Sequence, residues 1–146
     1  MTEKPELSYI DERLCFALYS SSKAVIAEYQ PYLSELGMTY PQYLVYMVLA
    51  ENGEVTVSDL GEQLFLDSGT LTPVLKRMET AGLVTRKRSE EDERKVMVSL
   101  TKQASKLNDK IASMQNNVVC AIAENYPGLA PLRDELKALN ARLRAR

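Results

Sequence analysis

The sequence predicts a mainly α-helical chain of the α+β class, folded as one compact domain. Three observations support this prediction. Apolar residues recur at helical spacing near both ends, two short helical patterns meet at a polar turn, and one stretch alternates with a period of two. A chain of 146 residues, 45% of them hydrophobic and 26% charged, is long enough for one good core.

The N-terminal part is expected to form two helices. Apolar residues recur on one face of a helix over residues 8–30, and Pro31 should end it because the residue before a proline disfavours the α conformation. The second helix, residues 40–51, should begin after Thr39, which is followed by a proline just inside the helix. Its residues are apolar nearly all round, so we expect it to be buried on most sides.

Two short helices joined by a tight polar turn should follow. The first should open at Thr56, whose hydroxyl can cap it. The second should begin in the cap-rich segment 67–70 and end at Gly82. Pro73 fits this second helix only within about its first turn, because proline has no N–H to donate. This pair is typical of a helix-turn-helix.

A β-hairpin is predicted next. Residues 83–88 and 95–100 alternate between apolar and polar side chains, and the charged segment 89–94 separates them as a turn. A helix-turn-helix followed by a hairpin is a winged helix. We therefore assign residues 37–100 to a winged helix-turn-helix, the predicted DNA-binding region.

The two ends of the chain are predicted to build a dimer. Thr101 should cap a long helix that Pro127 interrupts, and leucines then repeat at steps of three and four to the C-terminus. Such a stripe forms either a core within one chain or a seam between two chains. With the first helix, these stripes offer more apolar surface than the small central fold can cover. We therefore expect a homodimer, with residues 1–36 and 101–146 as its dimerisation region.

The absence of histidine excludes much catalytic and metal chemistry. It removes the usual general base and the commonest metal ligand, and two cysteines alone are too few for a structural zinc site. The sequence has no glycine-rich nucleotide-binding motif, so it predicts no metal and no cofactor. If the chain does chemistry, a cysteine is the best candidate.

Composition also indicates where the protein works. No apolar run reaches the roughly 18 residues that span a bilayer, and the first residues are polar and acidic, unlike a secretory signal. We therefore expect a cytoplasmic protein with no membrane partner and with both cysteines reduced at rest. The net charge of −2 argues against general coating of nucleic acid, but it allows a local basic patch.

Such a patch is predicted on the winged helix. Thr70, Lys76 and Arg77 lie off the apolar face of the second helix of the pair, so they are free to meet DNA. The two basic residues lie near the end of that helix and should hold phosphates, whereas Arg94 at the hairpin tip should reach a minor groove. The charges alone would fit an ordinary solvated surface equally well. The order of the elements favours double-stranded DNA.

Cys15 is the candidate reactive residue. Tyr19 and Tyr29 follow it at offsets of 4 and 14 on the same helical face, and Tyr40 could approach the same place. A phenol that donates a hydrogen bond to a thiolate favours this form, which reacts with peroxides. The same spacing also fits a buried cysteine among core tyrosines. Cys120 could resolve an oxidised Cys15 as a disulfide, within one chain or between two.

Three segments resemble the OhrR branch of the MarR family. They are residues 14–20 (LCFALYS), the long run 65–78 (FLDSGTLTPVLKRM) and the turn 86–94 (RKRSEEDER). The resemblance extends from about residue 7 to residue 125, and the run 65–78 is its specific part. It implies a dimeric winged-helix repressor, not an enzyme, which holds a palindromic operator when reduced. Oxidation by an organic hydroperoxide would release the operator.

The resemblance also implies a role for each matched residue. Cys15 would react with the peroxide, Tyr29 and Tyr40 would hydrogen-bond it, and Tyr19 would lie beside it. Cys120 resembles the resolving residue of a two-cysteine branch, in which the disulfide joins opposite subunits. The implied recognition-helix residues are Ser68, Thr70, Lys76 and Arg77, and the implied wing residues are Asp92 and Arg94, with the aspartate orienting the arginine.

Other interpretations share this fold. A MarR-type regulator could instead be released by a small aromatic acid in the dimer cleft, with both cysteines structural. A thiol peroxidase that uses Cys15 is disfavoured by the lack of histidine and by the DNA-binding pattern. A DNA-binding protein without any switch is the third alternative.

Overall fold

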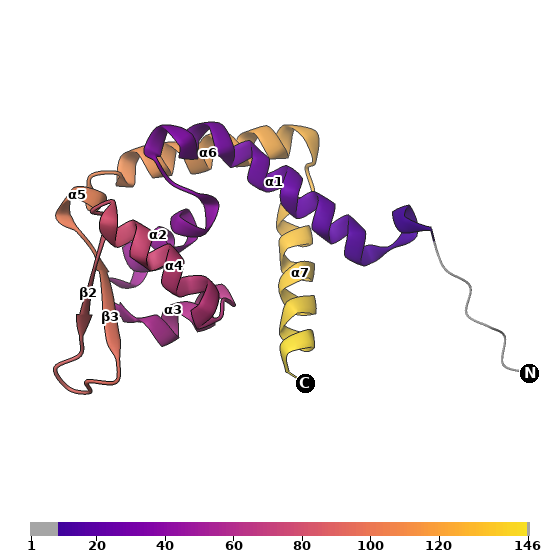
Figure 1. The fold of residues 1–146 in the computed structure, drawn as a ribbon. Coiled ribbons are helices and arrows are strands. Elements are labelled where there is room, and N and C mark those ends of the chain that lie inside the picture. The colour runs from indigo at the N-terminus through magenta and orange to yellow at the C-terminus, as the bar shows by residue number, and fades with distance from the viewer. Residues whose placement is uncertain (1–8, 146) are drawn as a thin grey trace, which may run out of the picture. The chain divides into compact units, whose positions relative to one another are not determined.

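The computed structural model describes residues 9–145, which form seven α-helices, a 3-10 turn and a three-stranded sheet (Figure 1). This confirms the predicted mainly helical α+β class. The chain divides into two compact units between residues 110 and 111, and each unit is described by itself. No helix within residues 9–145 is long and apolar enough to cross a bilayer.

The first helix differs from its prediction at both ends. A 3-10 turn, η1, spans Ile10–Glu12 and α1 spans Leu14–Leu36, while the expected first residue, Ser8, lies outside the described residues. The predicted end before Pro31 is wrong. This proline leaves one carbonyl without its helical N–H partner, but Leu33 beyond it is completely buried, and that packing outweighs the lost bond. Gly37 ends the helix in the left-handed conformation (φ 66°).

The second helix agrees with its prediction. α2 spans Tyr40–Asn52, and Thr39 and Gln42 cap it reciprocally, each side chain accepting a hydrogen bond from the other residue's backbone N–H. Six of its 13 residues are buried, five of them from the continuous apolar stretch in its middle. The hydroxyl of Tyr46 donates a hydrogen bond of 2.9 Å to the carbonyl of Ala104, which ties α2 to a segment 58 residues further along the chain.

The helix-turn-helix is present as α3 (Val57–Leu64) and α4 (Ser68–Thr80). Thr56 caps α3, accepting a hydrogen bond of 3.0 Å from the N–H of Asp59, as the sequence predicts. Pro73 lies in the second turn of α4, so the helix accommodates this proline beyond the first turn to which the sequence analysis expected it to be limited. The apolar face of α4 is held firmly in the core by its buried side chains, Leu71, Leu75 and Met78.

The hairpin consists of β2 (Val84–Arg88) and β3 (Val96–Leu100), which pair antiparallel with Arg86 opposite Val98. This confirms the predicted wing. A third strand, β1 (Val55–Thr56), pairs with the other edge of β3, so the sheet order is β1-β3-β2. Two residues are too short to show an alternating pattern, which is why the sequence did not predict β1.

The single long helix predicted from Thr101 is wrong, because the chain breaks it in two. Thr101 caps the short α5 (Lys102–Ser105), and α6 (Asn108–Asn125) begins after a turn. The carbonyl of Ala104 explains the break. It accepts hydrogen bonds from the hydroxyl of Tyr46 and, at 2.9 Å, from the N–H of Leu107, so a tight turn replaces the next α-helical bond.

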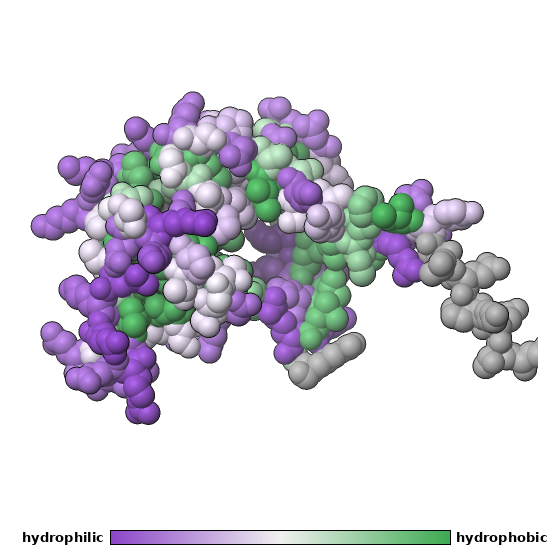
Figure 2. Space-filling model, in the orientation of Figure 1, coloured by the Kyte–Doolittle hydropathy of each residue, from purple (hydrophilic) through white to green (hydrophobic). Residues whose placement is uncertain are grey.

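The C-terminal unit contains most of α6 and all of α7 (Leu129–Arg144), separated at Pro127 as predicted. Ile111, Met114 and Val118 of α6 are buried. In contrast, none of the described residues of α7 is buried, and three of its five leucines, Leu132, Leu136 and Leu143, are exposed. Figure 2 shows apolar side chains at the surface of α7, and also at η1 and the start of α1.

Candidate nucleic-acid interface and redox site

The side of α4 opposite the core presents the predicted recognition residues. Its buried face holds one side of the helix in place, while Ser68, Thr70, Lys76 and Arg77 are all exposed. The start of the helix is fixed by Asp67, whose carboxylate accepts a hydrogen bond of 2.7 Å from the N–H of Thr70. This bond lowers the pKa of Asp67, so the cap stays ionised at neutral pH.

An open hollow lies along the second half of this exposed side. Its lining residues are Pro73, Lys76, Arg77, Thr80 and Ala81. The two basic residues therefore share one surface, which is recessed because the proline ring and the short side chains beside them do not project far from the helix. A recessed surface with two cations is suited to a phosphate backbone.

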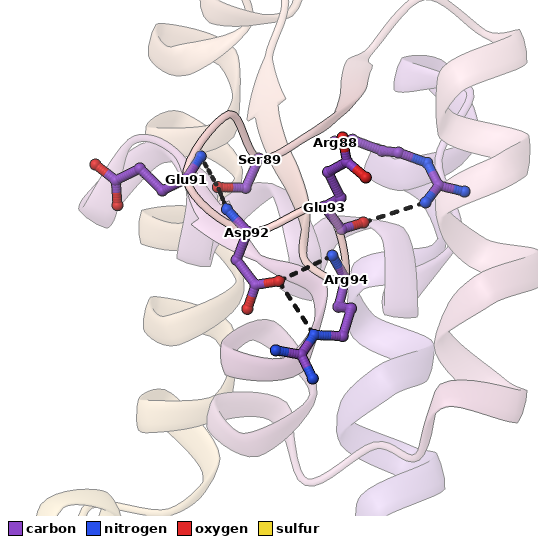
Figure 3. A network of polar contacts seen from close by, with 6 residues as sticks. All are labelled: Arg88, Ser89, Glu91, Asp92, Glu93 and Arg94. Atoms are coloured by element: carbon purple, nitrogen blue, oxygen red, sulfur yellow. Dashed lines mark hydrogen bonds and ion pairs between the residues drawn. The ribbon is translucent and has the colours of Figure 1, made fainter.

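The turn of the wing is a hydrogen-bonded network (Figure 3). Asp92 accepts bonds from Arg94 through its backbone N–H, at 3.1 Å, and through its side-chain Nε, at 3.4 Å. The hydroxyl oxygen of Ser89 in turn accepts from the backbone N–H groups of Glu91 and Asp92. These hydrogen bonds keep the turn ordered. The Arg94 side chain is 91% exposed, so it points outward from the turn.

A bidentate ion pair joins the recognition helix to the wing, and sequence reasoning missed it. Glu79 near the end of α4 accepts hydrogen bonds from Nε and Nη2 of Arg86 on β2, at 3.3 and 3.0 Å. These bonds lower the pKa of Glu79 and raise the pKa of Arg86. The pair spans a helix end and a strand, so no helical or strand periodicity could have indicated it. Arg86 is thereby held against the protein.

Cys15 is the second residue of α1 and is exposed, with no disulfide. The N-cap, Arg13, makes no side-chain capping bond, so the first N–H groups of this helix have no side-chain acceptor from their cap. One turn further on, Tyr19 is also exposed and accepts a hydrogen bond of 3.4 Å from the ammonium of Lys23, which lies 5.0 Å from the ring centroid. The position of Cys15 on this helix agrees with the sequence pattern, but its place in the first turn follows from the later helix start at Leu14.

Tyr29 and Tyr40 meet, as the sequence allows. Their ring centroids are 5.3 Å apart, and Tyr43, which sequence analysis did not single out, completes a cluster of three rings. Burial, together with the neighbouring phenols, raises the pKa of Tyr29 to about 12. Burial also raises the pKa of Tyr40. Both phenols therefore keep their protons, and remain hydrogen-bond donors, at neutral pH.

The cluster does not surround Cys15 of the same chain. Tyr29 follows Cys15 by 14 residues within one continuous helix, which at a rise of about 1.5 Å per residue separates them by about 21 Å along its axis. No phenol bridges such a distance. The structure thus joins Tyr29 with Tyr40, and leaves Tyr19 as the phenol nearest in sequence to the thiol. The second cysteine, Cys120, is exposed on α6 in the C-terminal unit.

Metal chemistry has no site in the part of the chain that the structure describes. Residues 9–145 contain no group of three or more histidine, cysteine or acidic side chains arranged to hold an ion.

The fold and the exposed side chains together define a class of protein. A winged helix that exposes polar and basic residues on its recognition helix, α4, and an ordered arginine at the tip of its wing defines a DNA-binding transcriptional regulator.

Comparison with known sequences identifies the family. The family model for the SarA/Rot transcriptional regulators matches residues 27–111. The chain is 45% identical over 139 residues, 95% of both sequences, to the organic hydroperoxide resistance transcriptional regulator of Bacillus subtilis. The chain therefore belongs to the OhrR type of MarR-family transcriptional regulators and is not an enzyme.

Solved structures agree with this assignment. The chain is similar to reduced AbfR bound to DNA, with a TM-score of 0.81 and 29% identity over 93% of each chain. It is also similar to a disulfide-formed AbfR, with a TM-score of 0.67 and 33% identity over 86% of this chain and 88% of that one. AbfR is a protein of Staphylococcus epidermidis. Together these relatives support a redox-sensing transcriptional repressor.

Proposed function

We propose that this protein is a homodimeric repressor that binds a palindromic operator when reduced and releases it when an organic hydroperoxide oxidises Cys15. The observation that best supports the proposal is the exposed Cys15 thiol in the first turn of a 23-residue helix, on the same chain as a winged helix. Unpaired N–H groups and the positive end of the helix dipole stabilise an anion at such a position.

The proposed chemistry needs two steps. The Cys15 thiolate attacks the terminal oxygen of the hydroperoxide, the O–O bond breaks, and the sulfenic acid and an alcohol form. The thiol of Cys120 from the partner subunit then attacks the Cys15 sulfur, a disulfide forms, and the oxygen leaves as water. Both cysteines are exposed in the single chain, and the disulfide-formed AbfR is an oxidised state of a relative.

Tyrosines from the partner subunit should complete the redox site. Because Tyr29 lies about 21 Å along the helix from Cys15 of its own chain, it can reach only the thiol of another chain. Tyr40 accompanies it in the ring cluster, while Tyr19 belongs to the same chain as the thiol. The raised pKa values of Tyr29 and Tyr40 keep both phenols protonated, so they are suited to donate hydrogen bonds to a thiolate.

The dimer is proposed to form through residues 1–36 and 101–146. Leu132, Leu136 and Leu143 on α7 are 43%, 38% and 54% exposed, and Leu14 and Phe16 at the start of α1 are 63% and 40% exposed. Apolar surface of this extent on regular helices is characteristic of a seam between chains. The winged helix, residues 37–100, would then occur twice in the assembly, as a palindromic operator requires.

Each winged helix should contact one half-site. Ser68 and Thr70 at the start of α4 would meet base edges, and Lys76 and Arg77 would hold phosphates. Arg94, oriented by Asp92, would enter the minor groove. A disulfide requires its two Cα atoms to lie within about 4.4–6.8 Å. If the two cysteines lie further apart than this in the reduced dimer, disulfide formation would move helices near the dimer seam and change the spacing of the two recognition helices.

The test uses a duplex selected from a random library by the reduced wild-type protein. The reduced protein should bind it, and cumene hydroperoxide should release it together with a dimer band on a non-reducing gel. Cys15→Ser should bind but ignore the peroxide, and Cys120→Ser should lose the dimer band. Release of Cys15→Ser by peroxide would refute the proposal. Release of wild type by a small aromatic acid alone would instead favour the ligand-responsive alternative.

A further inference from the structure

The Glu79–Arg86 ion pair attaches the outer edge of the wing to the recognition helix. The sheet order is β1-β3-β2, so β1 holds one edge of the wing through its pairing with β3, and β2 is the other edge. From this second edge Arg86 reaches Glu79 near the end of α4, with bonds of 3.0 and 3.3 Å. A bidentate pair fixes the direction between its partners as well as their distance. Both edges of the wing are therefore attached to the rest of the winged helix.

The root of the wing is a separate point of attachment. The N–H of Leu83 donates to the carbonyl of Met78 at 2.9 Å. The N–H of Gly82 donates to the carbonyl of Glu79 at 3.0 Å, which completes a Schellman motif at the end of α4. From the end of β3, the hydroxyl of Thr101 donates to the carbonyl of Gly82 at 2.7 Å. These bonds fix the turn that joins helix and hairpin, and the ion pair adds a second attachment further along β2.

Two points of attachment determine the angle between the recognition helix and the wing. β2 spans Val84–Arg88, which is about 13 Å at a rise of about 3.3 Å per residue. A tilt of about 10° at the root would move the far end of this strand by about 2 Å, and the tip beyond it by more. Hydrogen-bond lengths vary by only about 0.5 Å. A small tilt would therefore take Arg94 away from its contacts while α4 stays in place.

Folding stability is the smaller consequence of this pair. The side chains of Arg86 and Glu79 are 27% and 42% exposed. Ion pairs at such positions are screened by solvent and salt, and they contribute little to the free energy of unfolding. The fixed direction of the bidentate pair is therefore the property that operator binding would use.

We propose that Glu79 and Arg86 are positioning residues for operator binding, which hold the wing at the angle where Arg94 and the recognition helix contact the same half-site together. The proposal rests on the proposed function, because it needs the winged helix to bind an operator. Neither residue of the pair needs to contact DNA itself. A wing that is already oriented binds more tightly, because it need not be ordered when DNA binds. The effect of the pair is therefore measured through Arg94.

The test is a double-mutant cycle on the selected duplex, measured by fluorescence anisotropy with the full-length reduced protein. Arg94→Met should lower the affinity of wild type, and in Glu79→Gln its effect should be smaller by a factor of about five or more. The change that Arg94→Met makes in the salt slope should shrink as well. Arg86→Gln should behave in the same way. These two variants change the net charge in opposite directions, so a shared loss of coupling reports geometry rather than charge.

The matched control is Glu51→Gln, which removes an exposed carboxylate from α2, outside the proposed DNA surface. In this variant the effect of Arg94→Met should equal that in wild type. A pair that only stabilised the fold would lower the melting temperature of Glu79→Gln and of Arg86→Gln, but it would leave the effect of Arg94→Met unchanged. That result would overturn the inference.

Two other results would also contradict the inference. A shallower salt slope for Arg86→Gln, with an unchanged effect of Arg94→Met, would make Arg86 a direct phosphate contact. If Arg94→Met has no effect in wild type, the wing does not contact DNA and has nothing to position, although the redox proposal would stand. If wild type selects no duplex, the repressor proposal itself fails and this inference with it.

Discussion

Replacing Arg94 with methionine should reduce the salt dependence of operator binding. The arginine is 91% exposed and is oriented by Asp92, so its charge is available to DNA. Each cation that displaces a counterion contributes about 0.9 to the slope of log affinity against log salt. A dimer has two wings, so the slope should become shallower by about 1.8. Over a fourfold rise in salt, this corresponds to about a 12-fold smaller loss of affinity.

Fluorescence anisotropy at four salt concentrations measures this slope. Lys106→Met is the matched control, because Lys106 is an exposed cation at the end of α5, outside the proposed DNA surface, and its removal should leave the slope unchanged. Asp92→Asn weakens the contact that orients Arg94, so it should weaken DNA binding. Because it keeps the charge of Arg94, the salt slope should be preserved. An unchanged slope for Arg94→Met, or an equal change for the Lys106 control, would refute the assignment of the wing to DNA.

Three further predictions concern the framework of these sites. Tyr46→Phe should lower the free energy of unfolding by about 1 kcal/mol, measured by urea denaturation, because a buried hydroxyl loses its bonds to Ala104 and Asn108; an unchanged midpoint would contradict this. Glu79→Gln should remove stability that is present above the ordinary pKa of 4.5 and is lost as the pH falls through the lowered folded value; parallel acid-denaturation curves for variant and wild type would argue against the pair. The neutral Tyr29 phenol favours the folded state below pH 10, and this stability is lost as the pH rises from 10 towards 12, so Tyr29→Phe should lose less stability over that range. In Tyr29→Phe, absorbance at 295 nm should also show that the phenol lost from the titration is one that ionises at high pH. Loss of a phenol that titrates near pH 10 would instead show that the pKa of Tyr29 is not perturbed.

The sequence predicted the helix-turn-helix and the hairpin because local signals and burial agree there. Thr56 and Asp67 both cap the helices that they precede, and the alternation in residues 83–100 matches the observed strands. Where prediction failed, a contact distant in sequence decided the outcome. The burial of Leu33 carries α1 past Pro31, and the hydroxyl of Tyr46 accompanies the break between α5 and α6. Neither contact leaves a periodic signal in the sequence.

The candidate sites were predictable to a similar extent. Helical spacing correctly identified the exposed side of α4, because the buried residues of a helix fix where the others point. Spacing on one face did not convey distance along the axis, so it could not show that Tyr29 lies far from Cys15 of its own chain. The Glu79–Arg86 pair joins the end of α4 to β2, so no single segment encodes it.

The central claim is that oxidation of Cys15 releases DNA. Its most direct test is the affinity of the full-length protein for the selected duplex before and after one equivalent of cumene hydroperoxide, with Cys15→Ser measured in parallel. We predict that wild type loses binding, that dithiothreitol restores it, and that Cys15→Ser binds equally well before and after the peroxide. Full retention of binding by wild-type protein whose Cys15 is shown by mass spectrometry to be oxidised would contradict the account.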